Sequence, residues 1–254
     1  QVSEFRQGSV TQLLKNSGMD FIVIDNEHGP FSIETIADLS RAAVANQITP
    51  IVRVPDHSYA WIAQSLDAGA QGIMIPRITD PLQVKQILSY IKYPPLGARG
   101  SALSRGYTGF KGGNVSEVMA AANQETLCVI QVILLVLMLQ IETVEALKRI
   151  DEIVAIPGVD VAFIGPNDLS IALGVPGDIA HADMVSAITR VQKACEARPA
   201  SNPHVSVAIQ QNTIPLATHW SKAGVRMMCC FSETGLLSMG ATQVVQAVQA
   251  ARTK

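Results

Sequence analysis

The chain has 254 residues, of which 48% are apolar and 16% charged, so it can form a substantial core and does not have the composition of a disordered protein. Its formal net charge is −2 and it has no cluster of lysine and arginine, so neither nucleic acid nor a membrane is expected as a partner. Its four cysteines stand outside any C-x-x-C pair, which favours free thiols in a reducing, cytoplasmic setting. They are Cys128, Cys195, Cys229 and Cys230. The sequence begins at Gln1 rather than at methionine, and we expect a trimmed N-terminus.

Short apolar runs alternate with amphipathic stretches along the chain. In chain order, the expected strands are Val2–Phe5 as the remnant of a first strand, Phe21–Asp25, Pro50–Val54, Gly72–Ile75, part of Leu127–Ile141, Val161–Ile164, Val205–Ile209 and Val225–Cys229. The expected helices are Val10–Asn16, Ile33–Ala45, Tyr59–Ala68, Pro81–Ile91, Val144–Ala155, Ala182–Ala197 and Thr213–Ala223.

The fold class follows from this alternation. The expected strands are apolar on both faces, as parallel strands covered by helices should be. Eight of them in β-α order predict a (β/α)8 TIM barrel of parallel strands, and the length is typical of one such barrel. An open doubly wound sheet is the alternative, but no G-x-G-x-x-G motif follows the first strands. We therefore expect residues 1–254 to form a single barrel domain.

The only long stretch without periodicity is Tyr93–Asn114, which is rich in glycine, serine and arginine. Such a stretch inside a compact domain is usually functional. We interpret it as an active-site lid that follows the fourth strand, with a mobile surface loop as the alternative.

Polar side chains follow two of the apolar runs where each run ends. Gly165-Pro166-Asn167-Asp168-Leu169-Ser170 comes directly after VAFI, and Glu142 comes directly after another run. Two carboxylates at two strand ends indicate an oxygen-ligated divalent metal, Mg²⁺, Mn²⁺ or Co²⁺ rather than structural zinc. The amides around Gly165 and Asn167 could hold a substrate carboxylate. The alternative for Glu142 and Asp168 is a helix N-terminal acid favoured by the helix dipole.

Two further strand ends carry polar residues. His28 follows the strand Phe21–Asp25 and could act as a general base, with Asp25 orienting it or raising its basicity. Arg53 lies in the apolar strand Pro50–Val54, where it could stabilise negative charge that develops on an oxygen. The alternatives are a structural histidine and a structural ion pair with an acid of a neighbouring strand.

These features coincide in one known family. The segments FIVIDNEHGP, PIVRVP, AGAQGIMIP, KYPPLGARG, QIET and GVDVAFIGPNDLS cover most of residues 18–174. In order and spacing they resemble the HpcH/HpaI class II aldolases, which include 4-hydroxy-2-oxoheptanedioate aldolase and 2-keto-3-deoxyglucarate aldolase. The resemblance implies a (β/α)8 barrel that assembles as a homo-oligomer, a hexamer or trimer. It also implies reversible cleavage of 4-hydroxy-2-oxo acids to pyruvate and an aldehyde.

The resemblance also implies roles for individual residues. His28 resembles the proton acceptor and Arg53 the residue that stabilises the transition state. Glu142 and Asp168 resemble the metal ligands, and Gln140 and Asn167 resemble substrate contacts, Asn167 through its backbone. Family members place a basicity-tuning acid where this chain has Thr79, with Asp80 next to it.

One segment departs from the family pattern. The run Leu127–Ile141 has fifteen residues, too long for one strand of about 5–6 residues and too short for a membrane span of about 20. We interpret Val132–Gln140 as an insertion or an artefact of the gene model. Either Gln131 or Gln140 then takes the substrate position before Glu142.

Several functions remain open. One alternative is an oxaloacetate decarboxylase or macrophomate-synthase-like enzyme that forms the same pyruvate enolate. Another is a lyase of the citrate lyase β or malyl-CoA type, for which no basic phosphate site is evident. A non-enzymatic alternative is an inactive barrel that serves as a scaffold. A Schiff-base route is disfavoured because the candidates Lys85, Lys92 and Lys148 fall in helical stretches.

Overall fold

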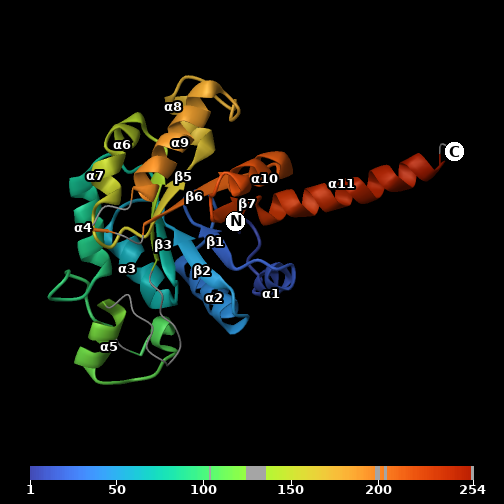
Figure 1. Cartoon of the computed structure of the whole chain (residues 1–254). Coiled ribbons are helices and arrows are strands. Elements are labelled where there is room, and N and C mark those ends of the chain that lie inside the picture. The colour runs from blue at the N-terminus through green and yellow to red at the C-terminus, as the bar shows by residue number, and fades with distance from the viewer. Residues whose placement is uncertain (103, 124–135, 198–200, 203–204, 253–254) are drawn as a thin grey trace.

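The computed structural model describes residues 1–102, 104–123, 136–197, 201–202 and 205–252 (Figure 1). Within them, seven parallel strands pair in chain order and curve into a nearly closed barrel covered by helices. The strands are β1 (Phe21–Asp25), β2 (Thr49–Arg53), β3 (Gly72–Ile75), β4 (Val136–Ile141), β5 (Val161–Ile164), β6 (Ser206–Gln211) and β7 (Met227–Cys230). The predicted fold class is therefore confirmed.

Helices alternate with the strands and pack outside them, except that α11 extends away from the barrel (Figure 1). They are α1 (Ser9–Asn16), α2 (Ile33–Ala45), α3 (Tyr59–Ala68), α4 (Pro81–Ile91), α5 (Val115–Asn123), α6 (Val144–Lys148), α7 (Ile150–Val154), α8 (Pro166–Ala172), α9 (Ala182–Glu196), α10 (Ile214–Lys222) and α11 (Glu233–Arg252), with a 3₁₀ turn η1 (Gly106–Thr108). The stretch expected as one helix from Val144 is divided at Arg149 into α6 and α7. None of the helices in the described ranges is long and apolar enough to cross a membrane.

The eighth strand position is filled by the first residues of the chain. Val2 forms a single parallel bridge with Ile24, through hydrogen bonds of 2.7 and 2.8 Å to the backbone of β1. On the other side, the backbone of Gln1 pairs with Phe231 and Glu233, just after β7. The expected strand Val2–Phe5 is thus reduced to one bridge. The backbone N–H groups of residues 3–5 bind the Glu233 carboxylate instead of a strand.

Side chains of the strands fill two separate cores, as expected for strands apolar on both faces. One core lies inside the barrel and is built from β1 to β7. Its buried members are Val23, Ile51, Met74, Met138, Val161, Phe163, Ala208 and Cys229. The other, larger core lies between the strands and the helices. Burying a side chain of this size contributes about 1.5–3 kcal/mol, so the two cores hold the strand ends in a fixed arrangement.

Strand β4 comes from the segment that departs from the family pattern. It pairs in regular register with β3, where Met74 faces Met138, and with β5, where Gln140 faces Phe163. The strand before Glu142 is therefore a regular member of the barrel, and Gln140 lies two residues before Glu142 at its end. The remainder of the run, including Cys128, Gln131 and residues 132–135, lies outside the described residues. Residues 136–140 of the predicted insertion Val132–Gln140 belong to β4, and the insertion itself stays a prediction.

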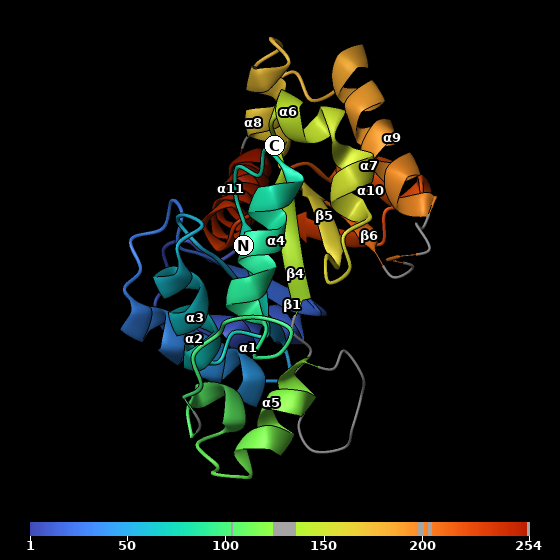
Figure 2. The ribbon, with the colours of Figure 1, turned by 90° about the vertical axis from the view of Figure 1, so that its left-hand side faces the viewer.

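The expected lid lies at the wrong end of the barrel. The segment from Tyr93 follows helix α4, which returns the chain to the end of the barrel where strands begin. Its described part packs beside α3, where the guanidinium of Arg99 lies 2.6 Å from Asp67 and stacks between Tyr93 and Tyr107. In Figures 1 and 2, α5 lies at the end of the molecule opposite α8. This segment therefore cannot cover the strand ends of its own barrel.

Candidate active site

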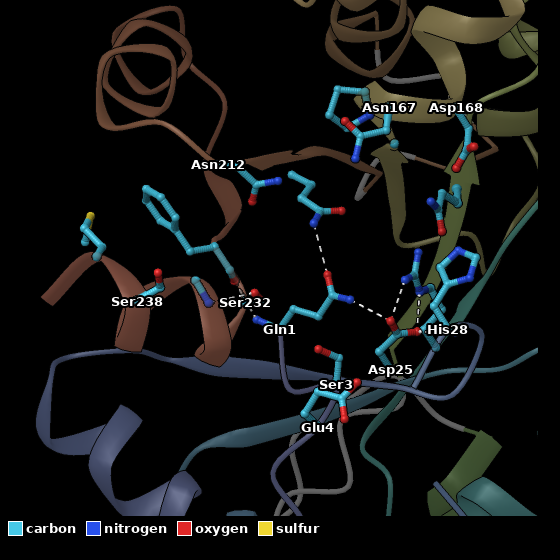
Figure 3. A pocket seen from close by; sticks show the side chains of 18 residues that line it. Gln1, Ser3, Glu4, Asp25, His28, Asn167, Asp168, Asn212, Ser232 and Ser238 are labelled. Atoms are coloured by element: carbon cyan, nitrogen blue, oxygen red, sulfur yellow. Dashed lines mark hydrogen bonds and ion pairs between the residues drawn. The ribbon is translucent and has the colours of Figure 1, made fainter. Parts of the chain in front are cut away.

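The carboxyl ends of the strands surround a cavity of about 730 Å³ (Figure 3). Its lining comes from the ends of β1, β2, β4 and β6, from the turns that follow β5 and β7, and from the first residues of the chain. The lining residues are Gln1, Ser3, Glu4, Asp25, His28, Arg53, Gln140, Gly165, Pro166, Asn167, Asp168, Gln210, Asn212, Phe231, Ser232, Gly235, Ser238 and Met239. Parallel strands direct all their carboxyl ends to one rim, which is why residues distant in sequence meet here.

Arg53 is fixed by two acids of the β1 end. Its Nε and Nη2 atoms donate to the Asp25 carboxylate at 2.8 and 2.7 Å, and its Nη1 lies 3.2 Å from Glu27. All three side chains are less than a tenth exposed. Burial alone would raise the pKa of Asp25, but the Arg53 guanidinium outweighs it and holds that pKa below its ordinary value. Arg53 therefore forms the ion pair that the alternative interpretation predicts, with Asp25 of the neighbouring strand β1, and this pair lies in the wall of the cavity.

The Asp25 carboxylate is directed at this arginine and at the turn, not at the imidazole. It accepts the backbone N–H groups of Glu27 and His28 and a side-chain hydrogen bond of 2.6 Å from Gln1. The acid beside the imidazole is Glu27, 3.7 Å from His28 Nε2. The side chain of His28 is 58% exposed and reaches into the cavity, as a proton acceptor for a ligand must (Figure 3).

Glu142 lies behind the cavity wall, buried at the end of β4. Its Oε1 accepts the backbone N–H of Arg77 at 2.8 Å, and its Oε2 accepts the Gln140 side-chain amide at 2.5 Å. The other amide atom, Gln140 Oε1, is buried without a hydrogen-bond partner in the described structure. Gly165 crosses so close that a Cβ there would lie 2.6 Å from Gln140 Nε2 and 2.8 Å from Glu142 Oε2.

The second carboxylate, Asp168, stands in the first turn of α8. This residue is exposed, and its oxygens project into the cavity from the same wall as Asn167 (Figure 3). Burial raises the pKa of Glu142 to about 7, and the negative charges of Asp168 and Glu27 add to this effect. A divalent cation would relieve that repulsion and use two hard oxygen donors. No group of three or more His, Cys, Asp and Glu side chains gathers around a metal position within the described ranges.

Two candidates from the family pattern lie outside this cavity. Asp80 is the N-cap of α4, where its carboxylate accepts the backbone N–H groups of Leu82 and Gln83. Thr79 donates to the Gln83 side chain. The structure thus brings together Asp25, His28, Arg53, Gln140, Glu142, Gly165, Asn167 and Asp168, but not Asp80.

Sequence analysis missed Glu27 and a whole side of the cavity. Glu27 lies between the candidates Asp25 and His28 in the sequence, but only the structure shows that it binds Arg53. The missed side consists mainly of residues after position 209 and residues 1–4. Gln210 and Asn212 could have been found from their place at the end of an expected strand, since they follow VSVAI. No lysine is among the described residues that line the cavity, and the exclusion of a Schiff-base route stays a prediction.

The fold and the site define the class of this protein, and its relatives place it in a family. The family model for HpcH/HpaI aldolase/citrate lyase matches residues 5–228. The 2-keto-3-deoxy-L-rhamnonate aldolase of Salmonella gallinarum is 33% identical over 223 residues, 86% of this chain and 79% of that protein. The enzyme of the same name from Salmonella schwarzengrund is 34% identical over 186 residues, 73% of this chain and 64% of the relative.

A solved structure agrees with these relatives. The HpcH/HpaI aldolase from Desulfitobacterium hafniense DCB-2 superposes with a TM-score of 0.87 at 26% identity, over 98% of this chain and 90% of that chain. A barrel with this site and these relatives is a carbon–carbon lyase of the aldolase type. The chain belongs to the HpcH/HpaI aldolase/citrate lyase family.

Proposed function

We propose that this protein is a metal-dependent class II aldolase that reversibly cleaves 4-hydroxy-2-oxo acids to pyruvate and an aldehyde. The observation that carries the proposal is the arrangement around Glu142. A buried carboxylate, an exposed one on Asp168 and the unpartnered oxygen of Gln140 lie at one rim with Arg53 and His28. This arrangement combines the donors of a hard cation with a base and a fixed positive charge.

The cation would be held by Glu142 and Asp168. When bound, Mg²⁺, Mn²⁺ or Co²⁺ would supply Lewis-acid stabilisation of negative charge on the 2-oxo acid. Gln140, whose amide nitrogen is already bound to Glu142, would contact the substrate through its amide oxygen. Gly165 has no Cβ, which leaves the space that the Gln140 amide occupies. The backbone of Asn167 would bind the substrate carboxylate at the start of α8.

His28 and Arg53 would carry the remaining steps. In the cleavage direction, His28 accepts the proton of the 4-hydroxyl group, directly or through water, while the C3–C4 bond breaks and the aldehyde forms. The bonding electron pair stays with the pyruvate fragment, and Arg53 stabilises the resulting charge on oxygen. Return of a proton to C3 gives pyruvate. Asp25 and Glu27 act by fixing the guanidinium, which makes them positioning residues.

The test uses two reactions that need no aldehyde: oxaloacetate decarboxylation and exchange of the pyruvate methyl protons. We expect EDTA to abolish both and Mg²⁺, Mn²⁺ or Co²⁺ to restore them. Glu142→Gln and Asp168→Asn should each lose at least about tenfold in the exchange rate, because each removes a charged ligand. Asp80→Asn is the matched carboxylate-to-amide control, since Asp80 caps α4 away from the cavity. A folded protein inactive with every metal would favour the inactive scaffold instead.

We further propose that the protein is a homo-oligomer, a hexamer or trimer, held in part by α11. This 20-residue helix extends away from the barrel, and no charged residue lies between Glu233 and Arg252 (Figure 1). Leu237, Val244 and Val248 are 61, 65 and 49% exposed. An apolar, uncharged helix of this length is typical of a subunit contact. Sedimentation of the native protein and of a Val244→Asp variant should show a larger assembly and its dissociation.

A further inference from the structure

The cavity has a second end, away from Glu142, that the proposed chemistry does not use. It is lined by the end of β6, the turn after β7, the first turns of α11 and the first residues of the chain (Figure 3). Its side chains are mostly amides and hydroxyls, namely Gln1, Ser3, Gln210, Asn212, Ser232 and Ser238, with apolar surface from Phe231 and Met239. A 4-hydroxy-2-oxo acid bound at the carboxylate rim would direct its aldehyde-derived part to this end.

This end of the cavity has no cationic side chain for an acidic substrate among the described residues. Among the described lining residues there is no lysine, and the only arginine, Arg53, is held by Asp25 and Glu27 at the other end. The charged side chain that the second end does contribute is Glu4. A carboxylate on the aldehyde would therefore be desolvated beside like charge, without a cationic side chain as its partner.

The N-terminus of α11 does not replace the missing cationic side chain. Helix N-termini attract anions through free N–H groups, but three of the N–H groups in this first turn are already bound. The N–H of Glu233 donates to the Gln1 carbonyl, that of Gly235 to the Ser232 hydroxyl at 3.1 Å, and that of Leu236 to the Ser232 carbonyl. The carboxylate of Glu233 itself stands in this first turn.

Two side chains at this end retain their full hydrogen-bonding capacity. Gln210 donates to Gln1 at 3.0 Å, and Ser232 is engaged with the start of α11. Asn212 and Ser238, in contrast, make no side-chain hydrogen bond within the described residues, although both line the cavity. An amide and a hydroxyl each offer a donor and an acceptor, which is what a ligand hydroxyl group needs.

We propose that this end of the cavity selects a neutral, hydroxylated aldehyde over a carboxylated or purely apolar one, with Asn212 and Ser238 as the specificity-determining residues. The inference rests on the proposed aldolase function, because it requires the 2-oxo acid to occupy the rim around Arg53 and Asp168. The cavity volume of about 730 Å³ is in the range that holds a substrate of this kind.

The experiment measures kcat/KM for aldol addition of pyruvate to glyceraldehyde, propanal and succinic semialdehyde. These acceptors carry hydroxyl groups, a methyl group and a carboxylate, respectively. We expect glyceraldehyde to exceed the other two by at least about tenfold, because only its hydroxyls pair with both side chains. Asn212→Leu, close in size to asparagine, should lower kcat/KM for glyceraldehyde about tenfold and leave that for propanal equal or higher. Ser238→Ala should act in the same direction. Asn212→Arg should raise kcat/KM for succinic semialdehyde.

Each preparation is also assayed for exchange of the pyruvate methyl protons, which involves no aldehyde. Asn16→Leu, at the exposed end of α1, is the matched control and should leave all three acceptors unchanged. If the wild-type protein exchanges the pyruvate methyl protons but prefers succinic semialdehyde or propanal as acceptor, this inference is wrong while the proposed function stands. An equal loss for all three acceptors in Asn212→Leu would overturn it as well. Loss of exchange in the wild-type protein under every metal would overturn the proposed function itself.

Discussion

Gly165→Ala tests the geometry around Glu142 with a single methyl group. Gly165 has φ −91° and ψ 93°, which alanine adopts without strain, so the backbone itself does not oppose the change. The new Cβ, however, would lie 2.6 Å from Gln140 Nε2 and 2.8 Å from Glu142 Oε2. Both side chains are buried, so neither can move aside into solvent.

The size of the effect follows from these distances. The closer contact is about 0.8 Å short of the 3.4 Å at which ordinary van der Waals contact begins, so the carboxylate and the amide must shift by an appreciable fraction of an ångström. Overpacking of this kind costs about 1–3 kcal/mol in the free energy of unfolding. A displacement approaching 1 Å in a group that positions substrate lowers the rate on the order of 10²-fold. We therefore expect a modest loss of stability and a large loss of activity.

The assay is pyruvate proton exchange as a function of Mn²⁺ concentration, together with thermal unfolding. Gly165→Ala should reduce the exchange rate about 10²-fold and weaken the apparent metal affinity, with Tm lower by about 2–4 °C per kcal/mol lost. Gly112→Ala is the control, since its Cβ would meet only Ser104 Oγ at 3.6 Å. Full exchange activity and unchanged metal affinity in Gly165→Ala would refute our account of this site.

Three further predictions concern the cavity wall and the core. Arg53→Lys keeps a charge but loses the two-point contact with Asp25, so we expect about 1–3 kcal/mol less stability and a proton-exchange rate about 10–10²-fold lower; a variant equal to the wild type in both would contradict the role assigned to the guanidinium. Burial would raise the pKa of Glu233, but three backbone N–H groups outweigh it and hold the pKa below 4.5, so Glu233 stabilises the fold above that pH and loses this effect as the pH falls through its lowered pKa. The difference in Tm between the wild type and Glu233→Gln should accordingly be constant above pH 5 and become smaller below it. A difference that grows in acid would contradict the lowered pKa of Glu233. Burial raises the pKa of the Cys195 thiol to about 12, so at pH 8 a thiol reagent should modify Cys195 only on unfolding and Cys230, which is partly exposed, earlier.

Local pattern predicted much of the barrel. The expected bounds of β1, β3, β5, α2, α3 and α4 agree with the structure, because their ends carry strong signals. Ser32 and Asp80 cap two of these helices with their side chains, and Gly69 ends a third at φ 114°. Strand ends also located the rim, since parallel strands place their carboxyl ends together.

The errors arose where the outcome depends on tertiary contacts. Periodicity cannot reveal that Arg53 binds Glu27, because the contact joins the last residue of β2 to the loop after β1. The lid was misplaced because α4 reverses the chain direction before Tyr93, and Arg99 then fixes the segment beside α3. Helix α11 is not predicted from the sequence, since only Leu236 at its start packs against a core and its exposed apolar residues give a weak amphipathic pattern.

The contact between residues 3–5 and Glu233 has a consequence for biosynthesis. It joins positions about 230 residues apart, and residues of both contacting segments line the second end of the cavity. On the ribosome, the rim formed by β1 to β5 can fold while its neighbours are still being synthesised. The opposite end of the cavity cannot form until Glu233 has emerged from the exit tunnel and bound residues 3–5. A nascent chain would thus assemble the side of the cavity around Arg53 before the side around α11.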